Sequence, residues 1–276
     1  MGIVWEDAID SYLAYTVASG SGRETIRLRR HYLGVLARHC SCAGPWQATT
    51  DDLVAVLATE GWAPETRKSA RSSIRGFYRW GMDTGKTTTD PSRALPRVRV
   101  PLGAPRPTPR DVVTRALAAA DNRARTMLLL ALLAGLRRAE IARVHHDHMI
   151  YETTFQETKD WSLRVVGKGG RVRVLPLHPL LAETLLAHGD GFLFPGNDHG
   201  HLSPDRTGRI IADLLGPGWT AHTLRHRFST EAYASRHDLF AVQALLGHAR
   251  PETTARYTAV PDESLRAAVL SVWSAA

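Results

Sequence analysis

Apolar residues recur at three- and four-residue intervals through most of the first 84 positions of the chain. This spacing places them on one face of a helix. It predicts four helices, over residues 5–18, 25–39, 50–60 and 66–83. Thr50, Asp51 and Asp52 stand where the third helix begins and are expected to cap it. The segment 1–84 is therefore predicted to be a small helical domain.

The pattern changes in the second half of the chain, where helical spacing gives way to alternation and then returns. Two helices are expected over residues 109–120 and 123–134, and the apolar run 127–136 marks the second as buried. Three strands are expected next, over residues 149–155, 161–166 and 171–175, the last two forming a hairpin around a glycine-rich junction. After Pro179 helices return. The predicted fold class is mainly α with a small antiparallel β-sheet.

Residues 85–108, between the two patterns, are rich in proline and arginine. Proline disfavours helix and favours an extended linker. We therefore expect three parts: a helical domain (1–84), a linker (85–108) and a second domain with a C-terminal tail (109–276). The linker is either plain and solvated or a basic strap on DNA; we favour the strap, because no acidic residue lies between Pro91 and Arg110.

Charge narrows the class of partner. The 276 residues include 35 Lys and Arg against 27 Asp and Glu, a net charge of +8, and a hydrophobic fraction of 43% that is normal for a globular protein. This basic excess indicates a polyanion, most often nucleic acid. Basic residues recur along one face of the fourth helix. Such a face could contact the phosphates of DNA, and the alternative is a basic face exposed to solvent. The expected DNA-binding residues are Arg67, Lys68, Arg71, Arg75 and Arg79 on that helix, and Arg97 and Arg99 in the linker.

The two cysteines and the N-terminus bear on the compartment. Cys40 and Cys42 are one residue apart, which places them poorly for a mutual disulfide, so we expect a cytoplasmic protein. The first seven residues do not have the pattern of a signal peptide. The longest apolar run is half the length of a membrane span and predicts a buried helix instead.

Five short segments carry phosphate ligands or proton-transfer groups. Arg137 follows the buried helix with Glu140 three residues later, and Lys168 lies at the hairpin tip. The other three segments supply His222 with Arg225 on one helical face, then His248, then Tyr257. Each segment alone is common by chance. The histidine-rich stretches 145–148 and 199–201 are expected to be a connection and a loop, and no metal site is predicted.

In this order the segments resemble the tyrosine recombinases, the lambda-integrase family. The matching stretches are Ala134-Gly135-Leu136-Arg137, His222-Thr223-Leu224-Arg225-His226, Leu246-Gly247-His248 and Tyr257. Residues 72–80, followed by Asp90 and Pro91, also resemble the last helix and exit of the family's core-binding domain. The resemblance implies a helical, SAM-like core-binding domain and an α+β catalytic domain. It is to the minimal two-domain type of short phage integrases and Xer recombinases, without an arm-binding domain.

The resemblance also implies roles. Tyr257 would attack the scissile phosphate and form a 3′-phosphotyrosyl link. Arg137, Arg225, His222 and His248 would bind the non-bridging oxygens, and His222 would also accept the phenolic proton. Lys168 would protonate the leaving 5′-oxygen. Glu140 would support Arg137 or a histidine. No cofactor is expected, because the phosphotyrosyl link conserves the bond energy.

The implied partners are a double-stranded DNA core site and further copies of the chain, as a dimer on each site and a tetramer in synapsis. A directionality factor is a further possible partner. An apolar stripe in the tail is expected to dock on a neighbouring protomer, with packing on its own domain as the alternative; it consists of Leu265, Val269, Leu270 and Trp273.

The expected function is site-specific recombination, for integration or excision of a phage or mobile element. The alternatives are Xer-type resolution of chromosome or plasmid dimers, a type IB topoisomerase, and a DNA-binding relative without catalysis. The six matching positions argue against the last of these.

Overall fold

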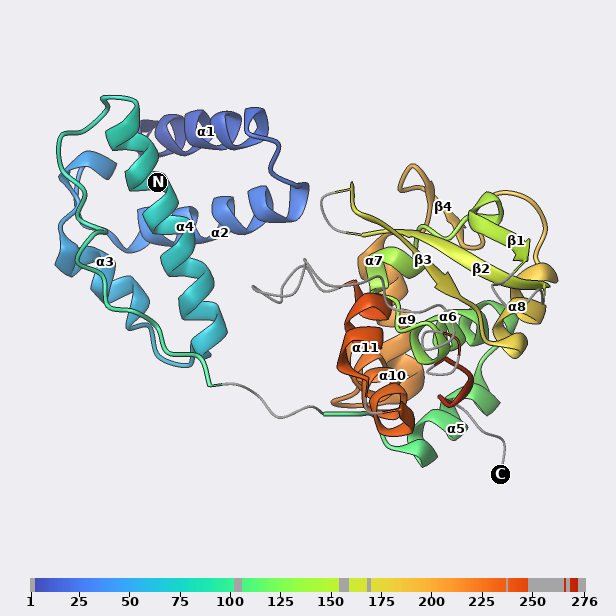
Figure 1. The fold of residues 1–276 in the computed structure, drawn as a ribbon. Coiled ribbons are helices and arrows are strands. Elements are labelled where there is room, and N and C mark those ends of the chain that lie inside the picture. Colours follow the sequence, from blue (N-terminus) through green and yellow to red (C-terminus); the bar gives the residue numbers. More distant parts are fainter. Residues whose placement is uncertain are drawn as a thin grey trace. The chain divides into compact units, whose positions relative to one another are not determined.

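In a computed structural model the chain divides into two units, Met1–Gly103 and Ala104–Ala276, each with its own hydrophobic core (Figure 1). The structure describes residues 3–101, 106–153, 159–167, 170–236 and 238–247, together with residue 266 and residues 269–272. No helix in these ranges is long and apolar enough to cross a membrane.

Helices make up the regular structure described in the N-terminal unit, as the apolar spacing predicts. They are α1 (Ile3–Ala18), α2 (Arg23–His39), the short 3-10 helix η1 (Pro45–Gln47), α3 (Thr50–Leu57) and α4 (Pro64–Asp83). Helix α2 contacts α1, α3 and α4. The core is aromatic: Trp46 stacks on Phe77 with ring centroids 5.2 Å apart, and Tyr12 meets Phe77 edge-on at 5.5 Å.

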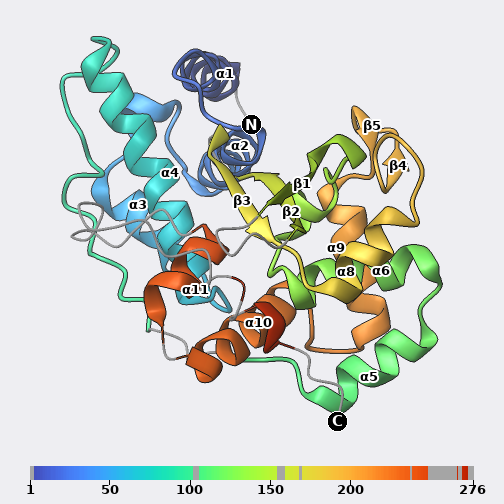
Figure 2. The same cartoon turned by 45° about the vertical axis from the view of Figure 1, so that its right-hand side comes forward.

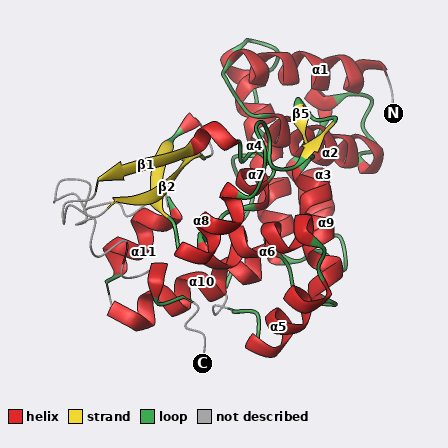
Figure 3. Cartoon of the chain, turned by 90° about the vertical axis from the view of Figure 1, so that its right-hand side faces the viewer, coloured by secondary structure: helices red, strands yellow, loops and turns green. Residues whose placement is uncertain are grey.

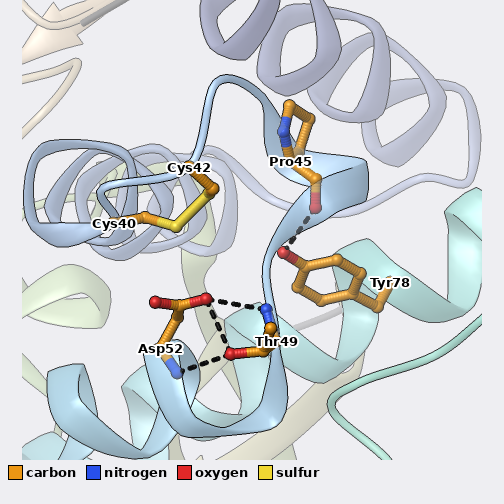
Figure 4. The surroundings of a disulfide bond; sticks show 6 residues. All are labelled: Cys40, Cys42, Pro45, Thr49, Asp52 and Tyr78. Atoms are coloured by element: carbon orange, nitrogen blue, oxygen red, sulfur yellow. Dashed lines mark hydrogen bonds between the residues drawn. A yellow bond between two sulfur atoms is a disulfide. The ribbon is translucent and has the colours of Figure 1, made fainter.

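The ends of α3 differ from the prediction. Its N-cap is Thr49, one residue before the expected cap: the Asp52 main-chain N–H donates to Thr49 Oγ1, and the Thr49 N–H donates to Asp52 Oδ2 at 2.8 Å (Figure 4). The helix ends at Leu57 rather than near Glu60. Arg67 of α4 donates to the carbonyl oxygens of Leu57 and Thr59 at 3.1 and 3.3 Å and satisfies the end of the helix.

Cys40 and Cys42 form a disulfide, which corrects the sequence prediction (Figure 4). Their Cα atoms are 5.3 Å apart, within the range that a disulfide spans. The chain leaves α2 at Cys40 in an extended conformation. Residues two apart in a fully extended chain are separated by about 6.6 Å, so the backbone bends between Cys40 and Cys42 and brings the two sulfur atoms together.

The first part of the proline-rich segment packs on the N-terminal unit. Leu95 is buried in its core, Thr50 Oγ1 donates to the Pro91 carbonyl oxygen at 2.9 Å, and Arg71 donates to the Leu95 carbonyl oxygen at 2.9 Å. The far end of the segment is attached to the second unit, where the Thr108 N–H donates to the Thr223 carbonyl oxygen at 3.2 Å. Residues near both ends of the segment therefore have fixed places, each in one unit.

The C-terminal unit combines helices with a small antiparallel sheet in the order β1 (Met149–Thr153), β2 (Lys159–Val166), β3 (Val172–Pro176). Leu163 of β2 pairs with Met149 and with Leu175. In Figures 2 and 3 the helices of this unit lie to one side of the sheet. The helices are α5 (Arg110–Ala119), α6 (Asn122–Leu133), α7 (Arg138–Ile141), η2 (His146–His148), α8 (Pro179–Leu186), α9 (Pro204–Leu215), α10 (Ala221–Arg236) and α11 (Leu239–Leu246).

Helix α6 is the centre of this core, as its apolar run predicts. Its residues 126–133 are all buried, and it contacts α7, α8, α9 and α10. The expected mainly α fold with a small sheet is therefore confirmed. A second short ladder, β4 (Pro195–Gly196) with β5 (Gly200–His201), was not predicted and lies where a loop was expected.

The described part of the tail packs on its own unit. Val269 and Val272 are buried in the C-terminal core, and Arg266 forms an ion pair with Asp160 at 3.1 Å. Leu270, also of the predicted stripe, is 51% exposed, so the tail is covered by its own unit only in part, and its docking on a neighbouring protomer stays a prediction. Leu265 and Trp273 lie outside the described residues.

Candidate active site

A tight turn after α6 brings Arg137 to the surface. Gly135 has a φ of +60°, and a Cβ there would lie 2.4 Å from the ring of Phe228. Both the positive φ and the close approach favour glycine. Arg137 follows as the N-cap of α7, with its side chain 39% exposed. The buried helix thus ends in a turn that presents a guanidinium group to solvent.

The carboxylate of Glu140 lies beneath that turn and accepts hydrogen bonds from two arginines. Arg137 donates from its main-chain N–H to Oε2 and from Nη1 to Oε1, both at 2.9 Å. Arg173 of β3 donates from Nη1 to Oε1 at 2.9 Å and from Nη2 to Oε2 at 2.8 Å. Arg225 Nη1 lies 3.8 Å from Oε2. The Glu140 side chain is only 4% exposed, so these contacts have little competition from water.

Burial and ion pairing shift the pKa of the Glu140 carboxyl in opposite directions. Burial raises the pKa of its carboxyl, whereas the hydrogen bonds from Arg173 and from the Arg137 main chain, with the charges of both, lower it. The net effect is a lowered pKa, so Glu140 is a carboxylate at neutral pH.

Arg225 is buried on α10 and oriented by main-chain oxygens. Its Nη1 donates to the carbonyl oxygen of Gly135 and its Nη2 to that of Leu246, both at 2.5 Å. Burial and the nearby charge of Arg137 lower the pKa of Arg225 to about 9, so the group stays charged at neutral pH. The guanidinium group is thereby fixed between the Gly135 turn and the end of α11.

His222 lies one turn before Arg225 on the same helix. Its Nε2 is 3.0 Å from Nε2 of His226, so one ring donates the hydrogen bond and the other accepts it. Partial burial of the ring, followed by the charges of His226, Arg225 and Arg137, lowers the pKa of His222 from its ordinary value of 6.5. His222 is therefore neutral at neutral pH and able to accept a proton.

These groups open onto one pocket of about 730 Å³ within the C-terminal unit. Helices α7, α9 and α10 line it, with the charged and titratable residues Arg137, Arg138, Asp205, Arg209, His222 and Arg225. Arg138 is paired with Asp205 at 3.3 Å. Cations thus outnumber carboxylates in the described lining, and the pocket is suited to a phosphate-bearing ligand.

The structure brings together Arg137, Glu140, His222 and Arg225. Lys168, His248 and Tyr257 lie outside the described residues. The glycines directly before two of them are described, however. Gly167 closes the base of the hairpin by donating to the Arg171 carbonyl oxygen at 2.7 Å, and Gly247 ends α11 in the left-handed conformation.

Arg173 is a partly buried arginine of this cluster that the sequence prediction missed. Strand alternation provides the signal: Val172 and Val174 are exposed, so Arg173 shares the inward face with Leu175. An arginine on the inner face of a strand needs an acidic or carbonyl partner. The pattern could have identified the residue but not its partner, Glu140.

The basic residues predicted to bind DNA in the N-terminal unit fall into two groups. Arg67 and Arg71 are partly buried and bind main-chain carbonyl oxygens of their own unit. The exposed ones are Lys68, Arg75, Arg79, Arg97 and Arg99. The exposed group has its charge open to solvent, with Arg79 lying 3.9 Å from Asp83.

The histidines of the stretch 145–148 have neighbours within the C-terminal unit. The rings of His145 and His148 are 5.9 Å apart, and His145 packs edge-on against Phe192. Within the described ranges, no three His, Cys, Asp or Glu side chains gather as a metal would require.

Comparison with known proteins identifies the family. Residues 108–264 match the Phage integrase family. The chain is 32% identical over 238 residues to the tyrosine recombinase XerD of Caulobacter vibrioides (76% of this chain, 75% of the relative). It is 34% identical over 249 residues to XerC of Rhodospirillum centenum (81% and 69%).

Solved structures of integrases share the fold of this chain. The integrase of mycobacterium phage Brujita is 27% identical, with a TM-score of 0.54 over 96% of this chain and 91% of that one. A lambda integrase tetramer bound to a Holliday junction shares the fold, with a TM-score of 0.70 at 21% identity over 92% and 79% of the two chains. The chain therefore belongs to the phage integrase family and is a tyrosine site-specific recombinase.

Proposed function

We propose that the hydroxyl of Tyr257 attacks a DNA phosphodiester, forming a 3′-phosphotyrosyl bond and releasing a 5′-hydroxyl. One observation carries the proposal: Arg137, His222 and Arg225 line a single pocket in which cations predominate. The attack concentrates negative charge on the non-bridging oxygens, which fixed guanidinium groups stabilise. Of the five N–H groups of Arg225, two bind carbonyl oxygens, and the others remain for phosphate.

The same proposal assigns the proton steps. His222 is neutral at neutral pH and accepts the phenolic proton of Tyr257, whose ordinary pKa is about 10. Lys168 donates a proton to the leaving 5′-oxygen, and His248 binds a non-bridging oxygen. Religation is the reverse reaction with a different 5′-hydroxyl. One phosphate ester is exchanged for another, so neither ATP nor a cofactor is needed.

Trapping the covalent protein–DNA adduct tests whether Tyr257 is the nucleophile and, in the same experiment, identifies the DNA site. Fragmented host and element DNA is incubated with the protein, denatured, and the fragments that remain attached are sequenced. A nicked duplex of that site, which loses its short 5′ product, then accumulates the adduct. We expect a denaturation-resistant adduct with the wild type, including in EDTA, and none with Tyr257→Phe. An adduct that persists in Tyr257→Phe would overturn the assignment.

The biological role follows from which pairs of sites recombine. We propose integration or excision of a phage or mobile element, where two unequal sites recombine; the Brujita integrase is a relative of this kind. Dimer resolution between two identical sites is the second candidate, supported by the XerC and XerD relatives. Plasmids carrying equal or unequal pairs of sites distinguish the two. Relaxation of supercoiled plasmid without any site would instead support a topoisomerase.

We further propose that the chain acts in the cytoplasm, as a dimer on each core site and a tetramer in synapsis. Structural neighbours include a lambda integrase dimer bound to a COC′ core site and the tetramer bound to a Holliday junction. A factor that sets the direction of recombination belongs to the same proposal. Gel-shift and cross-linking of the chain on its site measure the two assembly states.

A further inference from the structure

Arg173 uses every nitrogen of its guanidinium group inside the protein. Nη1 and Nη2 donate to the two oxygens of Glu140 at 2.9 and 2.8 Å, and Nε donates to the carbonyl oxygen of Leu245 at 3.1 Å. The side chain is 13% exposed. Partners on α7 and α11 thus fix the plane of the guanidinium group, and all three of its nitrogens bind within the protein.

Those contacts join three segments that are far apart in sequence. Arg173 lies on β3, at the end of the hairpin that carries Lys168. Glu140 belongs to the turn that presents Arg137, to which it is bound at 2.9 Å. Leu245 lies in the last turn of α11, three residues before His248. One side chain therefore connects the hairpin, the Arg137 turn and the end of α11.

Two glycines show how closely these segments pack around Arg173. A Cβ on Gly247 would lie 2.9 Å from Arg173 Cδ, and its φ is already positive at +60°. A Cβ on Gly167 would lie 3.5 Å from both Arg173 Nη1 and Glu140 Oε1. Gly167 precedes Lys168, and Gly247 precedes His248. The chain therefore passes beside the Glu140–Arg173 pair immediately before each of these two residues.

We propose that Arg173 is a positioning residue for strand cleavage: it fixes the hairpin against the Arg137 turn and α11, so that Lys168 reaches the leaving oxygen. This inference rests on the proposed function, in which Lys168 is the proton donor. Lysine at position 173 cannot reproduce the role, because an ammonium group lacks the planar fork that binds both Glu140 oxygens and a carbonyl at once.

The test compares Arg173→Met with Arg164→Met in adduct formation on the nicked site. Arg164 is exposed on the neighbouring strand β2, so its variant removes the same charge from the same sheet without touching Glu140. We expect Arg173→Met to bind the site like the wild type but to cleave about 100-fold more slowly, the effect of a small misplacement of a catalytic group. Arg164→Met is expected to cleave at the wild-type rate. An unchanged rate for Arg173→Met would overturn the proposal.

A second substrate separates positioning of Lys168 from a general structural defect. Sulfur in place of the bridging 5′-oxygen gives a thiolate leaving group, whose ordinary pKa of about 8.5 removes the need for a proton donor. We expect the defect of Arg173→Met relative to wild type to shrink to about tenfold or less on this substrate. A defect of equal size on both substrates would overturn the proposal.

Two controls keep the outcomes distinct. If Arg173→Met does not fold, as judged by circular dichroism and thermal melting, Arg173→Gln replaces it, because its amide can still donate a hydrogen bond to the Glu140 carboxylate, which keeps its bond to Arg137. The wild type and Tyr257→Phe are run alongside. No adduct with the wild type contradicts the proposed function itself, whereas equal adduct formation by the wild type and Arg173→Met contradicts only the role of Arg173.

Discussion

Glu140 is the residue that lets several arginines share one small volume. Arg137 and Arg173 bind its carboxylate, and Arg225 lies 3.8 Å from it. Without that negative charge, the neighbouring guanidinium groups would repel one another, and β3 would lose its ion pair with the Arg137 turn. A buried ion pair of this kind contributes mostly through the cost of breaking it.

Replacing Glu140 with Gln tests this balance. The amide leaves the buried Arg173 without a counter-charge, and we expect the C-terminal unit to lose about 3–5 kcal/mol at pH 7. Because the folded-state pKa of Glu140 is lowered from 4.5, its contribution is complete above pH 4.5 and is lost as the pH falls through the folded value. Urea unfolding from pH 7 to pH 3 should therefore show the variant and wild type converging in acid. A constant difference across that range would contradict the assignment.

After burial of the ring, the charge of His226 is the next cause of the lowered pKa of His222. If neutral His222 accepts the phenolic proton, cleavage slows as the pH falls through its pKa, and that pKa lies below 6.5. Removing the charge of the neighbouring ring with His226→Gln raises the pKa of His222. The acidic limb of the adduct-formation rate should then move to higher pH. Single-turnover rates from pH 5 to 8 measure the shift, with the exposed His199→Gln as control; an unmoved limb in His226→Gln would rule out His222 as the base.

At the scale of helices and strands, apolar spacing predicted the elements well but not their ends or their partners. The run 127–136 marked α6 as buried because every side of a central helix is covered. The cap at Thr49 and the packing of Leu95 depended on contacts with distant segments, which local spacing does not contain. In the site, the order of motifs identified Arg137, His222 and Arg225. It missed Arg173, because its partners Glu140 and Leu245 are 33 and 72 residues away.

The C-terminal end of α3 offers a matched pair of variants. Arg67 binds the carbonyl oxygens of Leu57 and Thr59, whereas Lys68, next in sequence, is exposed. Arg67→Ala should destabilise the N-terminal unit by about 1.5–3 kcal/mol, as expected for charged hydrogen bonds. Lys68→Ala should change stability by less than about 0.5 kcal/mol. Thermal melting of both variants measures the difference, and equal melting temperatures would show that the cap of α3 does not depend on Arg67.

At the scale of the whole molecule, we expect the basic residues to have two roles. Arg137 and Arg225 are fixed at the pocket, whereas Arg97 and Arg99 are exposed in the part of the proline-rich segment that belongs to the N-terminal unit. Exposed arginines that bind phosphate release counterions, so they control how binding depends on salt.

The double variant Arg97→Gln/Arg99→Gln tests this second role. If each arginine binds one phosphate, the slope of log affinity against log salt should become shallower by about 1.8, or 0.9 for each contact. Fluorescence anisotropy with the core site between 50 and 300 mM salt measures that slope. An unchanged slope would show that neither arginine contacts a phosphate.

Residues near both ends of the proline-rich segment are anchored, Leu95 in one core and Thr108 beside Thr223 in the other. The intervening chain of 13 residue steps (108 − 95) can span at most about 44 Å. That is about 13 base pairs along a duplex. Once one unit is on DNA, the other is tethered at an effective concentration of the order of millimolar. We therefore expect the two units together to bind DNA more tightly than either unit alone, and lengthening this tether should weaken binding without altering any contact.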